Sequence, residues 1–393
     1  MIALVVTCAH AFKTADGKYY TPSVYSYGFF RRYLNVFDNV KVVARTRPAS
    51  DDEVKGYLQM CGDGLTIHEL PYFQGIHSMI KRFLKLRRSA RRAADGCDCI
   101  IYRVPQIESY LTYLFGKNKK KPFAVEVVAS PLDWQIVSGI FKKVNVSLLR
   151  RMVRKANGVA YVTKEYLQRL YPCTAMLFGE TEEHFQGNYS SIELKDSDVG
   201  VPRKYLDVKA DLKIVHVANA IETNEKGHRE LIDITKDVRE QGHNVNTYFI
   251  GDGSLVSELK NYVNQLGLDD SIYFVGRLGS TNEVLEFLSK SDLMLFPTYT
   301  EGLPRCIIEA AATGLPVLST PVGGIPELID CSYLFEPQDI KGFSDKLIRL
   351  INNSEKLEDM SKANIETAQG FTESVLRLRR DEFYKKLRKL AEK

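Results

Sequence analysis

Short apolar runs recur along the C-terminal half of the chain, and a stretch with helical periodicity follows most of them. The runs are continuous rather than alternating, which is typical of strands buried on both faces of a parallel sheet. They cover residues 212–218, 245–251, 271–276, 292–297 and 315–320, with helical patterns at 227–241, 254–266, 281–290 and 305–313. Strands and helices that alternate at this spacing predict a parallel sheet with helices on both faces.

The N-terminal half repeats this rhythm less regularly, with strands predicted at 2–7, 40–45, 65–70, 99–104, 123–128 and 158–163. Residues 180–211 are polar and aperiodic, and 393 residues exceed the usual size of one core. We therefore expect an α/β protein of two doubly wound, Rossmann-like domains. The predicted boundaries are 1–205, 206–371 and a charged terminal helix at 372–393. Ligands of such sheets bind outside the carboxyl ends of the strands, which here means the cleft between the domains.

The composition changes this picture in two respects. Seven scattered cysteines indicate reduced thiols in a cytosol rather than disulfides or a zinc site, and no apolar run reaches the ~18–20 residues that span a bilayer. The net charge of +5 hides an asymmetry, because residues 1–200 carry 29 Lys+Arg against 19 Asp+Glu, whereas residues 201–393 carry 25 against 30. Two halves of opposite charge suggest different partners for each half.

Three loops that follow predicted strands carry residues suited to a nucleotide. Lys226 lies at a helix start, a poor place for a cation unless an anion docks there, although a solvated surface lysine is the competing interpretation. Gly251 and Gly253 allow close approach by a ligand, but Val256 breaks the G-x-G-x-x-G fingerprint. Arg277 ends the next strand, and an ordinary surface arginine is at least as good an interpretation there.

A fourth loop contains two glutamates eight residues apart, in the sequence EGLPRCIIE at 301–309. Pro304 suits the first helical position, and the free amides near it are suited to a phosphate. Glu301 fits sugar hydroxyls, and Glu309 fits a ribose diol unless it is simply a helix residue. Another glycine loop follows at 321–327. Several strand ends of one sheet that converge on a phosphate, a ribose and hydroxyls indicate a site together more strongly than any one alone.

These motifs resemble those of the GT-B glycosyltransferases of family GT4 over residues 212 to about 337. The shared elements are the E-x7-E pair Glu301 and Glu309, KGH at 226–228, GDG at 251–253, FVGRL at 274–278 and GGIPELI at 323–329. The resemblance implies a hexosyltransferase with the GT-B fold, a UDP- or GDP-linked sugar donor on the C-terminal domain and an acceptor on the N-terminal domain. It also implies retained anomeric configuration, no metal and no other cofactor.

The resemblance further assigns roles to residues. Lys226 neutralises the donor diphosphate and Glu301 holds the transferred sugar, which makes these two the catalytic residues. Glu309 binds the ribose, and the remaining donor contacts fall on Gly302, Leu303, Pro304, Arg305, Gly253, Arg277 and Gly17, the last in the loop after the first strand.

Two departures from the family pattern affect these roles. Ala220 stands where an arginine is frequent, and we hypothesise that Arg305 supplies that cation. The usual N-terminal histidine is missing from the strand end at 123–128. Asp133 is one stand-in, and His10, just after the first strand, is another, with an ordinary loop histidine as the alternative interpretation.

A basic segment at 77–95 carries seven Lys and Arg residues among apolar ones, and 116–122 adds more. No nucleic-acid motif surrounds them, so we expect an anionic membrane surface as the partner, with a solvated helix face as the alternative. The D-x-D sequence at 196–198 lies in the linker and is interpreted as a solvated loop rather than a metal site.

The predicted protein is thus a cytoplasmic transferase, peripheral on the inner face of the cell membrane. It would extend a glycan or a polyprenyl-diphosphate-linked glycan in the synthesis of capsule, O-antigen or exopolysaccharide. A GT-B-fold epimerase of nucleotide sugars and a non-catalytic nucleotide-sugar-binding protein are the alternatives. Intact Glu301, Glu309 and Lys226 argue against the second of these.

Overall fold

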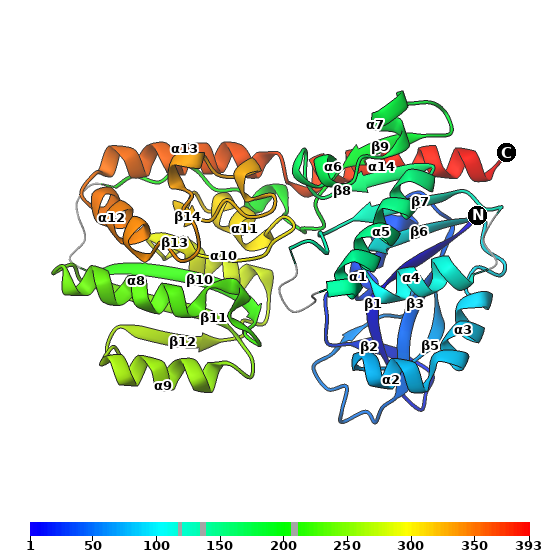
Figure 1. The fold of residues 1–393 in the computed structure, drawn as a ribbon, viewed down its shortest axis with the longest axis horizontal. Coiled ribbons are helices and arrows are strands. Elements are labelled where there is room, and N and C mark those ends of the chain that lie inside the picture. The colour runs from blue at the N-terminus through cyan, green and yellow to red at the C-terminus, as the bar shows by residue number, and fades with distance from the viewer. Residues whose placement is uncertain (117–119, 134–138, 206–210) are drawn as a thin grey trace.

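The computed structural model describes residues 1–116, 120–133, 139–205 and 211–393. Two α/β domains lie side by side, and the last helix returns from the second domain to the first (Figure 1). The predicted boundary at residue 206 lies outside the described residues, and so do residues 117–119 of the second basic segment.

The N-terminal domain is built on a sheet that has nine strands within the described ranges. Their order is β4-β2-β1-β6-β7-β8-β9, with β3 beside β1 and β5 beside β3, and only the short β2 and β4 pair antiparallel. The strands are β1 (Ile2–Lys13), β2 (Tyr19–Thr21), β3 (Asn39–Pro48), β4 (Leu58–Gln59), β5 (Leu65–Pro71), β6 (Cys99–Val104), β7 (Phe123–Val127), β8 (Gly158–Tyr161) and β9 (Phe185–Asn188).

The first strand is longer than the sequence predicts. β1 continues past a bulge between Val6 and Ala9 and pairs with the ten-residue β3 as far as Lys13. The prediction that His10 follows the first strand was therefore wrong, because the long partner strand keeps this segment extended. Gly17, with φ +83°, lies in the turn between β1 and β2.

Helices cover both faces of this sheet. Helices α3 (Phe83–Arg92), α4 (Ile107–Phe115) and α5 (Gly139–Lys155) bury their apolar stripes in one core, and α1 (Tyr27–Leu34) and α14 (Glu373–Ala391) bury theirs in the other. Shorter helices join the strands, namely α2 (Gly75–Lys81), α6 (Tyr166–Leu170) and α7 (Thr174–Phe178).

The C-terminal domain has a parallel sheet of five strands within the described ranges, in the order β12-β11-β10-β13-β14. All five predicted strands are present, as β10 (Leu212–Ala220), β11 (Val245–Asp252), β12 (Ile272–Gly276), β13 (Leu293–Phe296) and β14 (Val317–Ser319). The helices between and after them are α8 (His228–Glu240), α9 (Val256–Leu266), α10 (Thr281–Ser289), α11 (Arg305–Ala312), α12 (Ile340–Ile351) and α13 (Ser354–Gln369).

The two crossings between the domains are tied to each other. The backbone N–H of Glu373, which begins α14, donates to the carbonyl of Leu194, 2.6 Å away, in the segment that leaves the first domain. Asp196 accepts from the hydroxyl of Ser374. The D-x-D segment is thus a 3-10 turn (Asp196–Asp198) bound to the start of α14 rather than a free loop.

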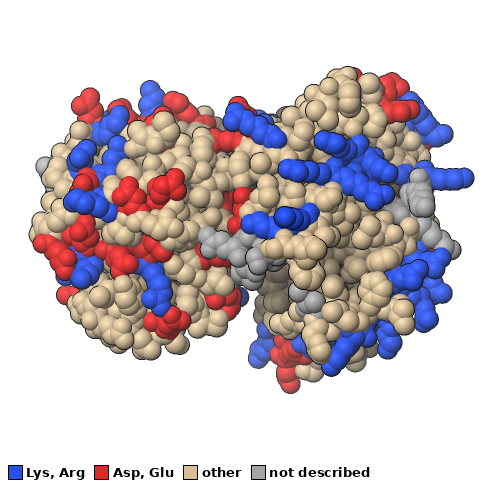
Figure 2. Space-filling model, viewed as in Figure 1, with Lys and Arg blue, Asp and Glu red and all other residues tan. Residues whose placement is uncertain are grey.

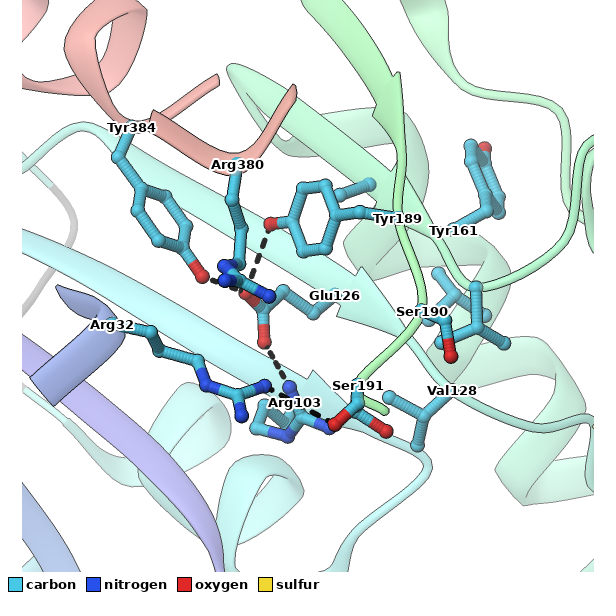
Figure 3. A pocket seen from close by; sticks show the side chains of 13 residues that line it. Arg32, Arg103, Glu126, Val128, Tyr161, Tyr189, Ser190, Ser191, Arg380 and Tyr384 are labelled. Carbon is cyan, nitrogen blue, oxygen red and sulfur yellow. Dashed lines mark hydrogen bonds and ion pairs between the residues drawn. The ribbon is translucent and has the colours of Figure 1, made fainter. Parts of the chain in front are cut away.

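A buried polar cluster anchors α14 on the N-terminal sheet (Figure 3). Glu126 of β7 forms an ion pair with Arg103 of β6, and both side chains are almost fully buried. The carboxylate also accepts hydrogen bonds from the hydroxyls of Tyr33, Tyr189 and Tyr384, which come from three other parts of the chain. Burial raises the pKa of Glu126, but Arg103 and the hydroxyls outweigh it and hold this pKa below its ordinary value.

Candidate active site

The C-terminal strands bring four predicted site segments to one edge of their sheet. Lys226 follows β10 and Glu301 follows β13, and the strand order reverses between these two strands. Gly253 and Arg277 follow the next strands outward, β11 and β12. The reversal point of an open parallel sheet leaves a crevice at the carboxyl ends, where α/β proteins bind their ligands.

Lys226 and Glu301 form an ion pair across this reversal point. The Nζ of Lys226 lies 2.6 Å from Oε1 of Glu301 and also donates to the carbonyl of Thr300, at 2.8 Å. The side chains are 30% and 13% exposed, respectively. Burial raises the pKa of Glu301 above its ordinary value, against the opposing charge of Lys226. Lys226 is thus partly exposed, and its carboxylate partner has a raised pKa. An anion that enters the crevice is therefore well placed to replace Glu301 as the partner of Lys226.

The loop after Glu301 leads into α11, which starts at Arg305. Pro304 is therefore the residue before the helix rather than its first residue, one position from the prediction, and its side chain makes no cap hydrogen bond. Helix α11 places Glu309 one turn after Arg305, on the same side. Burial raises the pKa of Glu309, and the charge of Arg305 opposes that effect. Within the described residues, Arg305 has no ion pair, so its charge is available for a ligand.

Gly302 brings this loop against the N-terminal domain. A Cβ at Gly302 would lie 2.3 Å from the carbonyl oxygen of Val128, just beyond β7, so only glycine fits there. A Cβ at Gly324 would likewise lie 2.7 Å from the methyl group of Thr163, which follows β8. The predicted cleft between the domains is therefore narrow at this point, and the carboxyl ends of both sheets face it.

Glu327 joins the two domains at the same place. Its carboxylate, on the loop after β14, accepts hydrogen bonds from the backbone N–H groups of Lys164, Glu165 and Tyr166 in the N-terminal domain. The hydroxyl of Tyr166 donates to Oδ1 of Asp133 at 2.6 Å. The chain from Glu327 through Tyr166 thus places Asp133 beside the C-terminal loops.

Asp133 is the predicted N-terminal residue that the structure brings to the cleft. Burial raises its pKa, and its Oδ2 atom is buried without a hydrogen-bond partner among the described residues. A carboxylate with one oxygen bonded to a tyrosine and the other unsatisfied has a free acceptor for a ligand hydroxyl. The sequence alone placed Asp133 at a strand end and Glu327 within the GGIPELI motif, without a role, but it gave no indication of Tyr166.

His10 and Gly17 are not brought to this site by their described contacts. The ring of His10 packs edge-on against Tyr72, with centroids 5.5 Å apart, and burial lowers its pKa to about 4, helped by Arg45. Gly17 is exposed in its turn and bonds to Thr14. His10 therefore has the environment of a packed strand histidine.

Gly253 and Arg277 lie at the outer end of the same edge. A Cβ at Gly253 would meet the carbonyl oxygen of Ile221 at 2.5 Å, so glycine is required by the approach of the β10 loop. Arg277 donates to the carbonyl of Asn219 at 3.3 Å and is otherwise exposed. Both are compatible with a ligand that extends outward from Lys226.

Two buried histidines, His216 and His228, pack against each other beside the turn that carries Lys226. Nε2 of His216 lies 2.8 Å from the carbonyl of Lys226, and its ring centroid lies 4.6 Å from that of His228. Burial lowers the pKa of His216 to about 4 and that of His228 to about 2. Both stay neutral, and the hydrogen bond from His216 positions the turn that carries Lys226. The sequence signal was the KGH motif, whose histidine was quoted without a role.

Comparisons with known proteins find a family match for the C-terminal domain and a relative along most of the chain. Residues 203–367 match the family model described as Glycosyl transferases group 1. Protein CapJ of Staphylococcus aureus is 27% identical over 346 residues, which cover 85% of this chain and 83% of that protein. The amylovoran biosynthesis glycosyltransferase AmsK of Erwinia amylovora is 32% identical over 148 residues, 35% of this chain and 36% of that protein.

Solved structures share the whole fold. Sucrose-phosphate synthase from Thermosynechococcus elongatus superposes with a TM-score of 0.71 at 13% identity and covers 99% of both chains. HepE from Anabaena, in complex with UDP and glucose, gives a TM-score of 0.64 at 16% identity, over 96% of this chain and 97% of that one. The fold is therefore GT-B, as predicted. The family match on the C-terminal domain and the named relatives support a glycosyltransferase.

Proposed function

We propose that the protein is a retaining glycosyltransferase that moves a sugar from a nucleotide-sugar donor to a hydroxyl of a glycan or lipid-linked glycan. The observation that carries this proposal is the Lys226–Glu301 ion pair at the reversal point of the C-terminal sheet. It combines a cation for a diphosphate with a carboxylate for sugar hydroxyls, beside the backbone amides at the start of α11.

The donor would bind along the carboxyl edge of the C-terminal sheet. In this proposal the diphosphate takes Lys226 from Glu301, and the released carboxylate then holds the transferred sugar together with the 302–304 backbone. Glu309 binds the ribose diol, and Arg305 supplies a second cation in the absence of one at Ala220. Gly253 and Arg277 lie where the nucleoside would pass. The complex of HepE with UDP and glucose, a protein of the same fold, supports a UDP-linked donor, with GDP as the alternative base.

The proposed reaction is a displacement on the face of the leaving group. The acceptor oxygen bonds to the anomeric carbon while the bond from that carbon to the diphosphate oxygen breaks. The acceptor proton passes to an oxygen of the departing diphosphate, so the configuration is retained. The protein then needs to position reactants and stabilise charge, the two tasks for which Lys226 and the free amides are suited. The proposed step uses no metal and no cofactor.

The acceptor would bind on the N-terminal side, at Asp133. Its unsatisfied oxygen is an acceptor for the attacking hydroxyl or a neighbouring one. Relatives named for amylovoran and colanic acid biosynthesis support a role in the synthesis of a bacterial surface polysaccharide.

We also propose that the acceptor is carried by a polyprenyl diphosphate and that the protein works at the cytoplasmic membrane surface, with the basic residues of 77–95 among its contacts. Within the described residues, no helix is long and apolar enough to cross a membrane.

A thermal-shift screen against UDP, GDP, ADP and their common sugars tests the donor site. We expect a rise of several degrees in melting temperature for one nucleotide series, lost in Lys226→Ala and Glu309→Ala, because a ligand that binds only the folded state stabilises it.

Transfer of radiolabelled sugar to lipid extracts from a polysaccharide-producing bacterium tests the reaction. Binding without transfer to any acceptor would favour a non-catalytic binding protein, and release of an altered nucleotide sugar would favour an epimerase. An Arg305→Ala protein with unchanged donor affinity and turnover would remove the role given to Arg305.

A further inference from the structure

Helix α5 combines an exposed apolar turn with an unusual excess of charge. Its first turns expose three large apolar side chains, Ile140 at 73%, Phe141 at 61% and Val144 at 57%. Its seventeen residues include six Lys and Arg and no Asp or Glu. The cations Lys142, Lys143, Arg150, Arg151, Arg154 and Lys155 line one open hollow of about 910 Å³. Large apolar side chains that are exposed together, with cations around them, indicate an interaction surface.

Four of the six cations of α5 lack an ion pair with any described residue. Within the described ranges Lys143, Arg150, Arg154 and Lys155 form no ion pair. Helix α14 offers a contrast, because four of its seven Lys and Arg residues pair with acids. Lys389, for example, contacts Glu182, and Arg388 contacts Asp38. These four cations of α5 therefore remain available to an external anion, whereas Arg380, Lys386, Arg388 and Lys389 of α14 are neutralised locally.

The neighbouring helices extend the same surface. Helices α3, α4 and α5 share one buried core on one face of the N-terminal sheet, and the hydroxyl of Tyr110 on α4 reaches the carbonyl of Asn145 on α5. Figure 2 shows Lys and Arg gathered over this domain, with uncharged surface between them. Exposed Leu84 on α3 and Leu114 on α4 add apolar side chains to it. We call this the α3–α5 face.

We propose that the α3–α5 face docks on an anionic phospholipid surface, with Ile140, Phe141 and Val144 of α5 entering the interface. Cations that surround apolar side chains are the arrangement of interfacial helices, in which the apolar groups enter the headgroup region and the cations meet lipid phosphates. A nucleic acid would use the cations but leaves no role for three exposed aliphatic and aromatic side chains at one helix end. The inference deepens the proposed function by naming α5, beyond the 77–95 segment, as the principal docking element.

The position of α5 gives this docking a consequence for the reaction. The helix starts six residues after Asp133, which lies in the cleft beside the C-terminal loops. Docking through the first turns of α5 would therefore bring the mouth of the cleft to the membrane surface. A hydroxyl on a lipid-linked glycan would then reach the donor without leaving the membrane.

Cosedimentation of the full-length protein with vesicles tests the proposal without any need for activity. We expect binding to phosphatidylglycerol–phosphatidylcholine vesicles at low salt, and little to pure phosphatidylcholine vesicles or at high salt. Replacing Lys143, Arg150, Arg154 and Lys155 by Gln is expected to weaken the partition coefficient about fivefold per charge, on the order of 100-fold or more in total. The Ile140→Ser, Phe141→Ser, Val144→Ser variant is expected to lose binding to a similar extent while it keeps its charge.

A matched control removes four cations from the C-terminal domain, in Lys236→Gln, Lys290→Gln, Lys341→Gln and Lys356→Gln, with the same change in net charge. Equal loss in both charge variants would overturn the assignment to α5, and so would wild-type binding by the Ser variant or no vesicle binding at all. Binding to single-stranded RNA in preference to vesicles would favour a nucleic acid as partner. Each variant is first checked for an unchanged melting temperature. Because vesicle binding needs no transfer, its failure is distinguishable from failure of the proposed reaction.

Discussion

Each domain holds an ion pair near the carboxyl edge of its sheet, and the two pairs differ in burial and in the number of hydrogen bonds that they accept or donate. Arg103 and Glu126 of the N-terminal domain are closed off from solvent, and three tyrosine hydroxyls donate to the carboxylate. Lys226 and Glu301 of the C-terminal domain are partly exposed, and among the described residues the Thr300 carbonyl is the one further hydrogen-bond partner of the lysine. The pKa of Glu126 is lowered and that of Glu301 is raised.

This difference distinguishes an ion pair that stabilises the fold, Arg103–Glu126, from one that is able to bind a ligand, Lys226–Glu301. A buried carboxylate that is fully hydrogen-bonded gains nothing from a ligand, and its removal leaves an unpaired buried charge. A carboxylate whose pKa is raised and whose partner is half-exposed is held less firmly and can exchange that partner. Loss of the first pair should therefore reduce stability, whereas loss of the second should reduce activity.

The largest effect is expected on the stability side of this comparison. Glu126→Ala leaves Arg103 buried without a partner and three hydroxyls without an acceptor, so we expect a loss of about 3–5 kcal/mol in the free energy of unfolding. Urea denaturation measures it. Glu53→Ala, which removes the partner of Arg47 in an ion pair exposed on both sides, is the control and is expected to lower the free energy of unfolding far less. A stable Glu126→Ala protein would mean that this pair is not what anchors α14.

The activity side is tested by Lys226→Ala. Loss of the cation that faces the leaving diphosphate is expected to lower turnover by about 10²–10³-fold, with little change in melting temperature. Lys236→Ala, an exposed lysine of α8 that faces Glu240, is the control and should keep full activity. Turnover within tenfold of wild type for Lys226→Ala would reduce the ion pair to a structural contact and end the contrast between the two pairs.

Glu309→Ala distinguishes donor binding from chemistry within the same site. Loss of a charged hydrogen-bond acceptor for the ribose is expected to raise the KM for the donor about 10–100-fold, because such bonds contribute about 1.5–3 kcal/mol. The KM for the acceptor should stay constant in the same initial-rate series. Glu286→Ala on α10 is the matched surface change. A shift in acceptor KM alone would contradict the role of Glu309.

The last expected effect is a gradual pH dependence caused by the histidines beneath Lys226. Their pKa values are lowered in the folded state, so the unfolded chain takes up protons near pH 6.5 while the folded protein does not. The free energy of unfolding therefore falls as the pH drops from about 6.5 towards 4, by on the order of 1 kcal/mol per pH unit for each histidine. Thermal melts across this range should show a shallower slope for His228→Gln than for wild type. His77→Gln, at an exposed position on α2, should leave the slope unchanged.

The C-terminal domain could be predicted well because its strands and site residues follow from short, continuous stretches of sequence. Continuous apolar runs fix buried parallel strands, and the residues after each run necessarily meet at one edge. Lys226, Glu301, Gly253 and Arg277 were therefore placed at the same edge without a structure. Their distances were not predictable, and neither was the direct contact between Lys226 and Glu301.

Long-range pairing explains what the sequence missed. His10 appeared to follow a strand because the apolar run weakens near residue 7, but pairing with β3 extends the strand to Lys13. Glu327 and Tyr166 come from different domains, so their hydrogen bond depends on how the domains meet. The exposed apolar turn of α5 depends on tertiary burial, because Val146 and Leu149 on the same helix are buried and equally apolar.

The tie between the two crossings, from Glu373 to Leu194 and from Ser374 to Asp196, has a mechanical meaning. A single crossing would act as a swivel, around which one domain could rotate in any direction. Two crossings fastened side by side resist torsion and leave bending about one line as the soft motion. The paired segments therefore favour bending between the domains in one direction over free rotation.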